Sequence, residues 1–295
     1  MRVGLLAAAV ALGGCSYWYR PVPVRAAIGK ERTALASDSF SVHRDARFEV
    51  YGPGSQAVFD AYEQLNRTYR AFDRYFSAPA PRLAVVLYPE WSKPGDSTAE
   101  RVLRERGAVV LRFVRPLRAS FRERVGDDGY EGSLWPVGPA AVRFLLASAA
   151  APDVPLDTTT LARLPAWYRS AVMSIVGESG TMPEDVQYMR ENRGSRWTLD
   201  QLLALDRPTS ADSALDPYRR DDADDHDRRF SSQSSAFMQF LIEREGVGTM
   251  AALGRGFAKG EAFALQASRF RVLPRTTTEL EERWLAWLSA QRPVW

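Results

Sequence analysis

The stretch GSQAVFDAYEQLNRTYRAFDRYF, residues 54–76, predicts a long amphipathic helix. Its large apolar side chains recur at spacings of three and four residues, which places them on one helix face. These residues are Val58, Tyr62, Leu65, Tyr69, Phe72 and Phe76. Alternating runs before it, in 40–53, and the apolar run RLAVVLYP after it, 82–89, predict strands. Strands on both sides of one helix predict a small sheet that the helix covers.

The rest of the chain predicts one more strand and then helices almost throughout. AVVLRFVRP, 108–116, has the apolar, β-branched composition of a strand, and a short helix is expected around 98–106. Apolar periodicity after Trp135 predicts the other helices, two of them with threonine N-caps. They are 138–150, 164–178, 198–205 (Thr198 with Gln201), 234–245, 246–258 and 276–290 (Thr276 with Glu279). The charged tract between two of them, 216–229, predicts a loop.

The predicted fold class is therefore α+β, a small sheet with a long covering helix followed by a mainly helical lobe. We expect an α/β lobe at 38–130 and a helical lobe at 131–295. The 295 residues are 45% hydrophobic, enough for a sizeable core. Lys and Arg number 39 against 36 Asp and Glu, a formal net charge of +3. This excess is small and dispersed along the sequence, so no nucleic-acid partner is expected.

The N-terminus has the pattern of a bacterial lipoprotein signal. A positive start, Met1-Arg2, precedes an apolar run, 3–12, that is far shorter than the ~20 residues of a membrane span. Leu12-Gly13-Gly14-Cys15 then resembles a lipobox, in which small residues precede a cysteine that becomes lipidated. We expect a signal peptide at 1–14, lipidation at Cys15, and a tether at 15–37. The alternative is an ordinary secretory signal with a chance cysteine.

The lipobox resemblance implies a place in the cell. The mature chain would be attached to a membrane of the bacterial cell envelope through its N-terminal lipid. Ser16, in place of aspartate after the cysteine, favours the outer membrane, with the protein facing the periplasm. Cys15 is the sole cysteine, so no disulfide within the chain is expected.

Conventional catalytic motifs are absent from the sequence. It contains no G-x-S-x-G, no P-loop and no Ser-x-x-Lys pair. GVGTMA, 246–251, matches G-x-G-x-x-A but follows a helix, which favours a helix stop and restart over dinucleotide binding. The two histidines, His43 and His226, are far apart. The aspartates of 221–227 lack the glycine and glutamate of a calcium loop and are expected to be solvated. No cofactor and no metal are predicted.

Two segments carry a family resemblance: LPAWYRSAVMSIVGE, 164–178, and SSQSSAFMQFLIEREGVGTMAALGRGFAKGE, 231–261. They resemble patterns of the gluzincin-like "peptidase MA" domains of bacterial envelope zinc peptidases. In those families a helix with H-E-x-x-H precedes a helix resembling L-P-x-W-L-x-E-G-x-A-x-Y, and a later helix resembles Y-x-Q-S-x-x-F-x-x-Y-L. The matches are Leu164, Pro165 and Trp167 in the first segment and Gln233, Ser234, Phe237, Phe240 and Leu241 in the second. The resemblance covers roughly 38–265 and implies a thermolysin-like arrangement.

The sequence departs from the family at the positions that bind zinc and activate water there. The position of the third zinc ligand, a glutamate in the family, is Ser170 here. The helix expected to carry H-E-x-x-H, 138–150, contains no histidine and no glutamate. Zinc hydrolysis needs imidazole and carboxylate ligands and a glutamate base. We therefore expect a metal-free, catalytically inactive relative in which Trp167, Val172 and Ile175 keep a packing role.

Three hypotheses of function remain open on the sequence. The first is a lipid-anchored protein that binds a peptide or an envelope protein without cutting it, with 108–116 as the edge strand that pairs with the partner. The second is an active hydrolase with an unrecognised site, for instance one built on Glu178, Asp185 and the acidic tract. The third is a structural lipoprotein whose cleft is filled by its own side chains.

Overall fold

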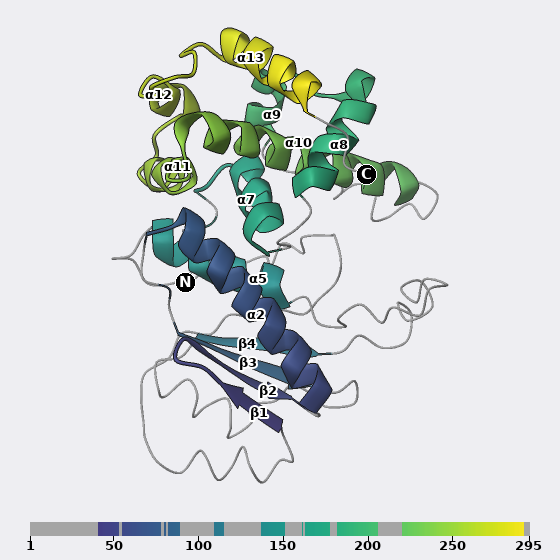
Figure 1. Ribbon diagram of the computed structural model, residues 1–295, viewed down its shortest axis with the longest axis vertical. Helices are drawn as coiled ribbons and strands as arrows, with labels where there is room; N and C mark the ends of the chain where they lie inside the picture. The colour runs from purple at the N-terminus through teal and green to yellow at the C-terminus, as the bar shows by residue number, and fades with distance from the viewer. Residues whose placement is uncertain are drawn as a thin grey trace, which may run out of the picture.

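The computed structural model describes residues 41–52, 55–77, 80, 82–88, 109–114, 137–150, 161, 163–177, 182–205 and 220–291. A small sheet lies at one end of this part and a group of helices at the other (Figure 1). The predicted signal peptide, Cys15, the tether and the helix around 98–106 lie outside the described residues.

The sheet has four strands in the order β1-β2-β3-β4. They are β1 (Ser41–Arg44), β2 (Phe48–Gly52), β3 (Leu83–Tyr88) and β4 (Val109–Val114). β1 and β2 are antiparallel because three residues join them in a hairpin, as the alternating runs predict. β2 and β3 are parallel, since a helix connects them and returns the chain to the same end of the sheet. β4 continues the parallel arrangement beside β3 and ends the described sheet.

Helix α2 (Ser55–Tyr75) covers one face of the sheet, as its amphipathic pattern predicts (Figure 1). Phe48 and Val50 of β2 point to this face and are buried in one core with the apolar stripe of α2. The Phe48 ring lies 5.1 Å from the Tyr69 ring. His43, on the same face of β1, contacts the Tyr62 ring at 3.8 Å, so this histidine packs against α2.

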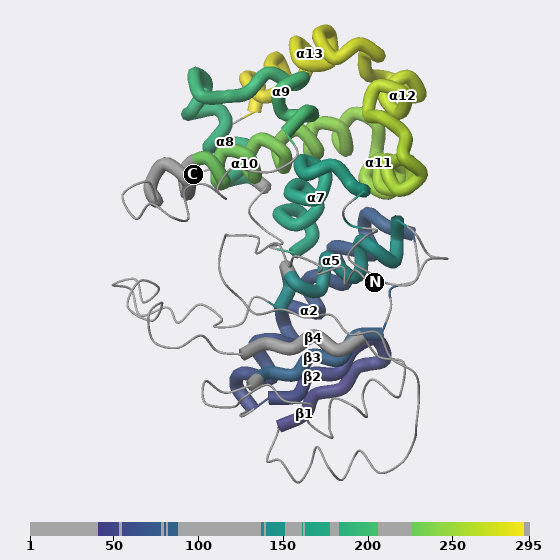
Figure 2. The backbone as a smooth tube through the Cα atoms, turned by 180° about the vertical axis from the view of Figure 1, so that it is seen from behind, coloured from purple at the N-terminus to yellow at the C-terminus, as the bar shows by residue number. Residues whose placement is uncertain are grey.

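Helix α5 (Val137–Ala150) joins the sheet to the helices. It packs against α2, β4 and two elements of the helical part. Figure 2 shows from behind that α5 lies beside α2, under the lower end of α7. At Gly138 the approach is so close that a Cβ would lie 2.7 Å from the Gly177 carbonyl oxygen and 2.9 Å from Thr68 Oγ1. Position 138 therefore requires glycine, because the start of α5 lies directly against the backbone of Gly177 and against α2.

The predicted helix 164–178 is two segments, α7 (Ala166–Val172) and a π-helical turn, η1 (Met173–Gly177). The Trp167 side chain is almost fully buried, with ring centroids 5.6 Å from Phe237 and 5.6 Å from Phe263. Val172 and Ile175 are buried as well. The packing role predicted for these residues is confirmed.

The remaining helices pack mainly around the long helix α10 (Arg220–Glu245), on the side of α7 away from the sheet (Figure 1). They are α8 (Met182–Glu191), the short 3-10 turn η2 (Arg193–Ser195), α9 (Leu199–Ala204), α11 (Thr249–Ala258), α12 (Phe263–Ala267) and α13 (Thr277–Ala290). The predicted caps are present: Thr198 and Gln201 form a capping box, and Thr276 accepts from the Glu279 amide. Gly246, at φ 101°, ends α10 before α11 begins, so the GVGTMA segment is a helix stop and restart.

One prediction for this region is wrong. The charged tract 216–229 was expected to be a loop, whereas α10 already begins at Arg220 and includes most of it. Aspartates favour a helix N-terminus because they complement its partial positive charge, and alternating charges are compatible with a solvated helix face. The α+β class, mainly helical, is confirmed. No helix in the described residues combines the length and the apolar character that crossing a membrane requires.

Candidate functional site

Ser170, which aligns with the third zinc ligand in the resemblance noted above, lies half-buried in the middle of α7. α7 packs mainly against α10, whereas α5 meets the following turn, η1. The α5 residues Ala141, Val142, Leu145 and Leu146 are all buried and form an apolar packing surface. Within the described ranges, no three His, Cys, Asp or Glu residues come together in a group that could hold a metal ion. Ser170 therefore lies on a helix that packs on α10, and α5 meets the following turn η1 through an apolar surface.

β4 lies at the end of the described sheet, beside α5. Its register aligns Val109 with Leu83 and Val114 with Tyr88, so all six residues pair with β3 on one side. Both views place β4 on the side of the sheet nearest α5 and β1 on the far side (Figures 1 and 2). The expectation that 108–116 forms an edge strand is confirmed for the sheet as described. The edge of β4 that faces away from β3 is the position where a further strand could pair.

A buried polar cluster joins α8, η1 and α10. We call it the serine cluster; it consists of Ser174, Asp185, Ser231, Ser232 and Ser235. Ser232 Oγ donates to Asp185 Oδ1 at 2.8 Å, and Ser174 Oγ lies 3.0 Å from Ser231 Oγ. Ser174, Ser232 and Ser235 are buried, and so is the second carboxylate oxygen of Asp185. The cluster is therefore a polar interface inside an otherwise apolar helical core.

Burial sets the electrostatics of this cluster. Loss of solvent raises the pKa of the Asp185 carboxyl above its ordinary value. The hydroxyls of Ser235 and Ser232 and the charge of Arg228 act against this rise, whereas Glu184 adds to it. The Arg228 guanidinium itself lies over the Tyr188 ring, 4.6 Å from its centroid. Ser232 thus takes the place of water at one oxygen of the carboxyl, whereas Asp185 Oδ2 and Ser235 Oγ have no hydrogen-bond partner among the described residues.

The serine cluster does not have the arrangement of a hydrolase. A serine nucleophile needs a base that takes its proton and space for a substrate. Ser232 is 3% exposed and its hydrogen bond goes directly to a carboxylate. The two histidines lie elsewhere, His43 against Tyr62 and His226 against the Trp197 ring at 4.9 Å. Of the residues suggested for an unrecognised hydrolase, Asp185 is thus a half-buried carboxyl that accepts from Ser232, and Glu178 lies outside the described residues.

Sequence reasoning did not find this cluster as a site. The signal was SSQSS, residues 231–235, four serines and a glutamine within an apolar stretch. Its carboxyl partner Asp185 lies on α8, a helix that the sequence did not predict. Gln233 of the same run has another role: its side chain accepts from the Trp197 amide at 3.1 Å and donates to the Trp197 carbonyl at 2.7 Å. It therefore ties the segment before α9 to α10.

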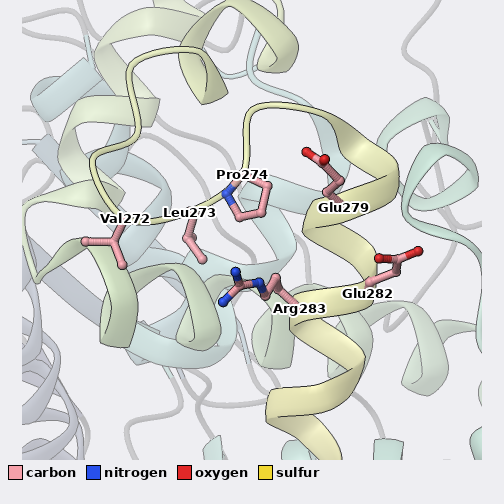
Figure 3. Close-up of a pocket in the computed structure, with 6 residues that line it drawn as sticks. All are labelled: Val272, Leu273, Pro274, Glu279, Glu282 and Arg283. Carbon is pink, nitrogen blue, oxygen red and sulfur yellow. The ribbon is translucent and has the colours of Figure 1, made fainter.

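A surface hollow of about 540 Å³ lies between the 272–274 segment and α13 (Figure 3). Arg283 points toward this segment and Glu282 points away from it (Figure 3), whereas the Glu279 carboxylate turns back and accepts from the Thr276 hydroxyl at 2.8 Å. The Glu245 carboxylate accepts from the amides of Arg271, Val272 and Leu273, at 2.8, 2.8 and 2.7 Å. One wall of the hollow is thus held in place, but its mixed charges select no particular ligand.

Comparisons with protein-family models, with curated proteins and with solved structures find no match for this chain. The class that the fold defines is a mainly helical α+β protein with a four-stranded sheet in its described part. Function must therefore be argued from the geometry of the chain itself.

Proposed function

We propose that this chain is a lipid-anchored, catalytically inactive protein of the bacterial envelope that binds an extended peptide or protein segment along β4. The observation that carries the proposal is the position of β4 at the end of the sheet, beside α5. Strand addition uses backbone N–H and C=O groups, so it needs neither a metal nor a particular side chain. Six residues at about 3.3 Å each offer roughly 20 Å of backbone to a partner strand.

Packing between the two resembling segments supports a peptidase-like origin for the fold. Trp167, from the first segment, contacts the ring of Phe237, from the second, at 5.6 Å. Residues about 70 positions apart in the sequence thus meet in one core. The α5 helix, where the resembling peptidases carry H-E-x-x-H, has a buried apolar surface instead. A retained scaffold with an apolar α5 favours binding over metal-dependent cleavage.

The lipid anchor is the second part of the proposal. Cys15 would carry the lipid after removal of residues 1–14, and the folded part would face the periplasm from the outer membrane. Twenty-five residues separate Cys15 from Ser41, the start of β1. The partner is then a peptide or a protein of the envelope that presents an extended segment.

A pair of proline variants in β4 tests binding along this strand. Successive residues of a strand direct their amides to opposite sides, so one of Val110→Pro and Leu111→Pro removes an amide facing β3 and the other an amide facing outward. Binding of an extended-peptide library to the detergent-solubilised full chain would be measured. We expect one variant to lose peptide binding while it keeps the wild-type melting temperature. Peptides with N-methylated backbones should not bind.

Two outcomes would contradict the proposal. Stoichiometric zinc in the purified chain, together with chelator-sensitive peptide cleavage, would show an active peptidase. Wild-type peptide binding by both proline variants would show that β4 is not the binding strand. If the wild-type chain binds no member of the library, the structural hypothesis replaces the binding one.

A further inference from the structure

Six arginines gather at the end of the α/β lobe where β1 turns into β2, β3 begins and α2 ends. Three lie on one face of α2, at spacings of three and four residues: Arg67, Arg70 and Arg74. The other three flank the strands: Arg44, Arg47 and Arg82. Figure 1 shows the last turns of α2 lying over this end of the sheet. We call these six residues the arginine end.

Ion pairs hold three of these arginines close together. Arg47 Nη1 lies 2.6 Å from Asp73 Oδ2, which ties the β1–β2 turn to the last turn of α2. Arg82 and Arg44 both pair with Glu49, a buried carboxylate that also accepts from the Tyr51 hydroxyl. Arg82 and Arg44 still expose 57% and 41% of their side chains. Two guanidinium groups thus share one buried carboxylate and leave net positive charge at the surface.

The arginines of the α2 face are exposed and largely without partners. Arg67 and Arg70 form no hydrogen bond or ion pair with any residue in the described ranges, and Arg74 lies over the Tyr75 ring at 5.5 Å. The carboxylates nearby are Asp45, Glu49 and Asp73, together with Glu63 one turn before Arg67 on α2, which leaves an excess of two positive charges. An arginine in the last turn can stabilise the helix C-terminus, but Arg67 lies two turns earlier.

We propose that the arginine end docks on the headgroups of an anionic phospholipid membrane. This inference rests on the lipid anchor of the proposed function, which would hold the lobe next to a bilayer. Guanidinium groups bind phosphate oxygens with two parallel hydrogen bonds, and several on one face attract a negatively charged surface. The 25 residues between Cys15 and Ser41 reach at most roughly 85 Å, so the anchor alone does not decide which end faces the bilayer.

Docking at this end has a consequence for binding. The arginine end lies at the tips of β2 and β3, whereas β4 presents its length at the side of the sheet. A lobe seated on the arginine end would therefore point the strands, β4 included, away from the membrane surface, so that a partner could approach β4 from the periplasm and not through the lipid. The membrane contact orients the binding strand.

The orientation can be measured with a single fluorescent label. Cys15 is the sole cysteine and would be acylated, so Ser77→Cys, three residues beyond Arg74, provides one reactive thiol near the arginine end. Val272→Cys, at a side chain 68% exposed among the helices at the other end, provides the matched control. The lipidated full chain is reconstituted into vesicles that carry a quencher on the lipid headgroup. We expect quenching at 77 but not at 272 in phosphatidylcholine vesicles containing phosphatidylglycerol.

Charge variants separate docking from other causes of quenching. Arg67→Gln/Arg70→Gln/Arg74→Gln, high salt, or pure phosphatidylcholine should each abolish quenching at 77. The corresponding Arg→Lys triple should restore it, and Arg255→Gln/Arg271→Gln/Arg275→Gln, at exposed sites in the helical part, should leave it unchanged. Equal quenching in neutral vesicles, or quenching retained by the Arg67/Arg70/Arg74 triple, would overturn the proposal. Flotation of the unlabelled chain with neutral vesicles tests the anchor separately, and peptide binding tests the function of β4.

Discussion

Asp185 is the residue at which burial should make the stability of the fold depend on pH. Burial raises its pKa in the folded chain above the ordinary value. Between those two values the folded chain keeps a proton that the unfolded chain has lost, so the free energy of unfolding falls as the pH rises through this window. We expect Asp185→Asn, which cannot ionise, to be more stable than wild type at neutral pH and to lose this advantage in acid.

Urea denaturation at a series of pH values measures this difference. Asp200→Asn is the matched control, because Asp200 is exposed in the first turn of α9. An Asp185→Asn chain that is less stable than wild type at neutral pH would show that the ionised carboxylate contributes favourably through Ser232 and Arg228. The burial argument would then be wrong.

Gly254 is a second residue whose identity the packing requires. A Cβ at this position would collide with the hydroxyl of Tyr168. That side chain cannot move away easily, because it is fully buried and donates to the Met250 carbonyl at 2.8 Å. Overpacking in a filled core typically destabilises by about 1–3 kcal/mol, so Gly254→Ala should lower the free energy of unfolding by that amount.

Gly248 and Tyr168 provide the controls for this prediction. A Cβ at Gly248 meets no atom within 4 Å, so Gly248→Ala should be close to neutral. Removal of the tyrosine hydroxyl in Tyr168→Phe/Gly254→Ala should recover part of the loss. If Gly254→Ala unfolds at the same urea concentration as wild type, Tyr168 has room to shift and the packing argument fails.

At the scale of elements, the sequence predicts what apolar periodicity controls and misses what depends on charge or on short contacts. α2 and α13 follow their patterns closely because one face of each is buried, and α5 does so because it is buried on almost every side. The first turns of α10 carry charged residues without an apolar stripe, so no periodicity marks them as helix. α8 and α12 are short and obtain their stability from neighbours that are distant in the sequence.

The contact of α10 with the 271–273 segment gives a prediction at this scale. Three successive amides, of Arg271, Val272 and Leu273, donate to the Glu245 carboxylate. Hydrogen bonds to a charged group contribute roughly 1.5–3 kcal/mol. Glu245→Ala should therefore lower the free energy of unfolding by at least about 1.5 kcal/mol. Hydrogen exchange at the three amides should accelerate first, since the segment loses its acceptor before the core opens.

Arg244→Ala, which changes an exposed neighbour of Glu245, is the control for this variant. It should leave exchange at 271–273 unchanged. Equal exchange rates in wild type and Glu245→Ala would indicate that packing of the buried Leu273 side chain, and not the carboxylate, holds the segment.

At the scale of the whole molecule, the sequence predicts the parts of the candidate site but not how they meet. The edge position of β4 was expected, and the segments containing Trp167 and Phe237 do share one core. The serine cluster could not be anticipated, because Asp185 and Ser232 are 47 residues apart and join only when α8 packs on α10. The sequence also does not show that α5 packs against η1, the turn that follows Ser170, and not against the part of α7 that contains Ser170.

The lipid anchor is the prediction on which the location of the whole molecule depends. Cys15→Ala removes the only acceptor for the lipid, so the chain expressed in a bacterial host should lose palmitate label and should no longer require detergent for extraction. Its peptide binding should stay at the wild-type level, because the proposal assigns peptide binding to the backbone of β4 and not to the lipid. Ser16→Asp should keep the label but move the chain from outer to inner membrane fractions. Palmitate incorporation into Cys15→Ala would contradict the lipobox, and an outer-membrane location of Ser16→Asp would contradict the sorting argument alone.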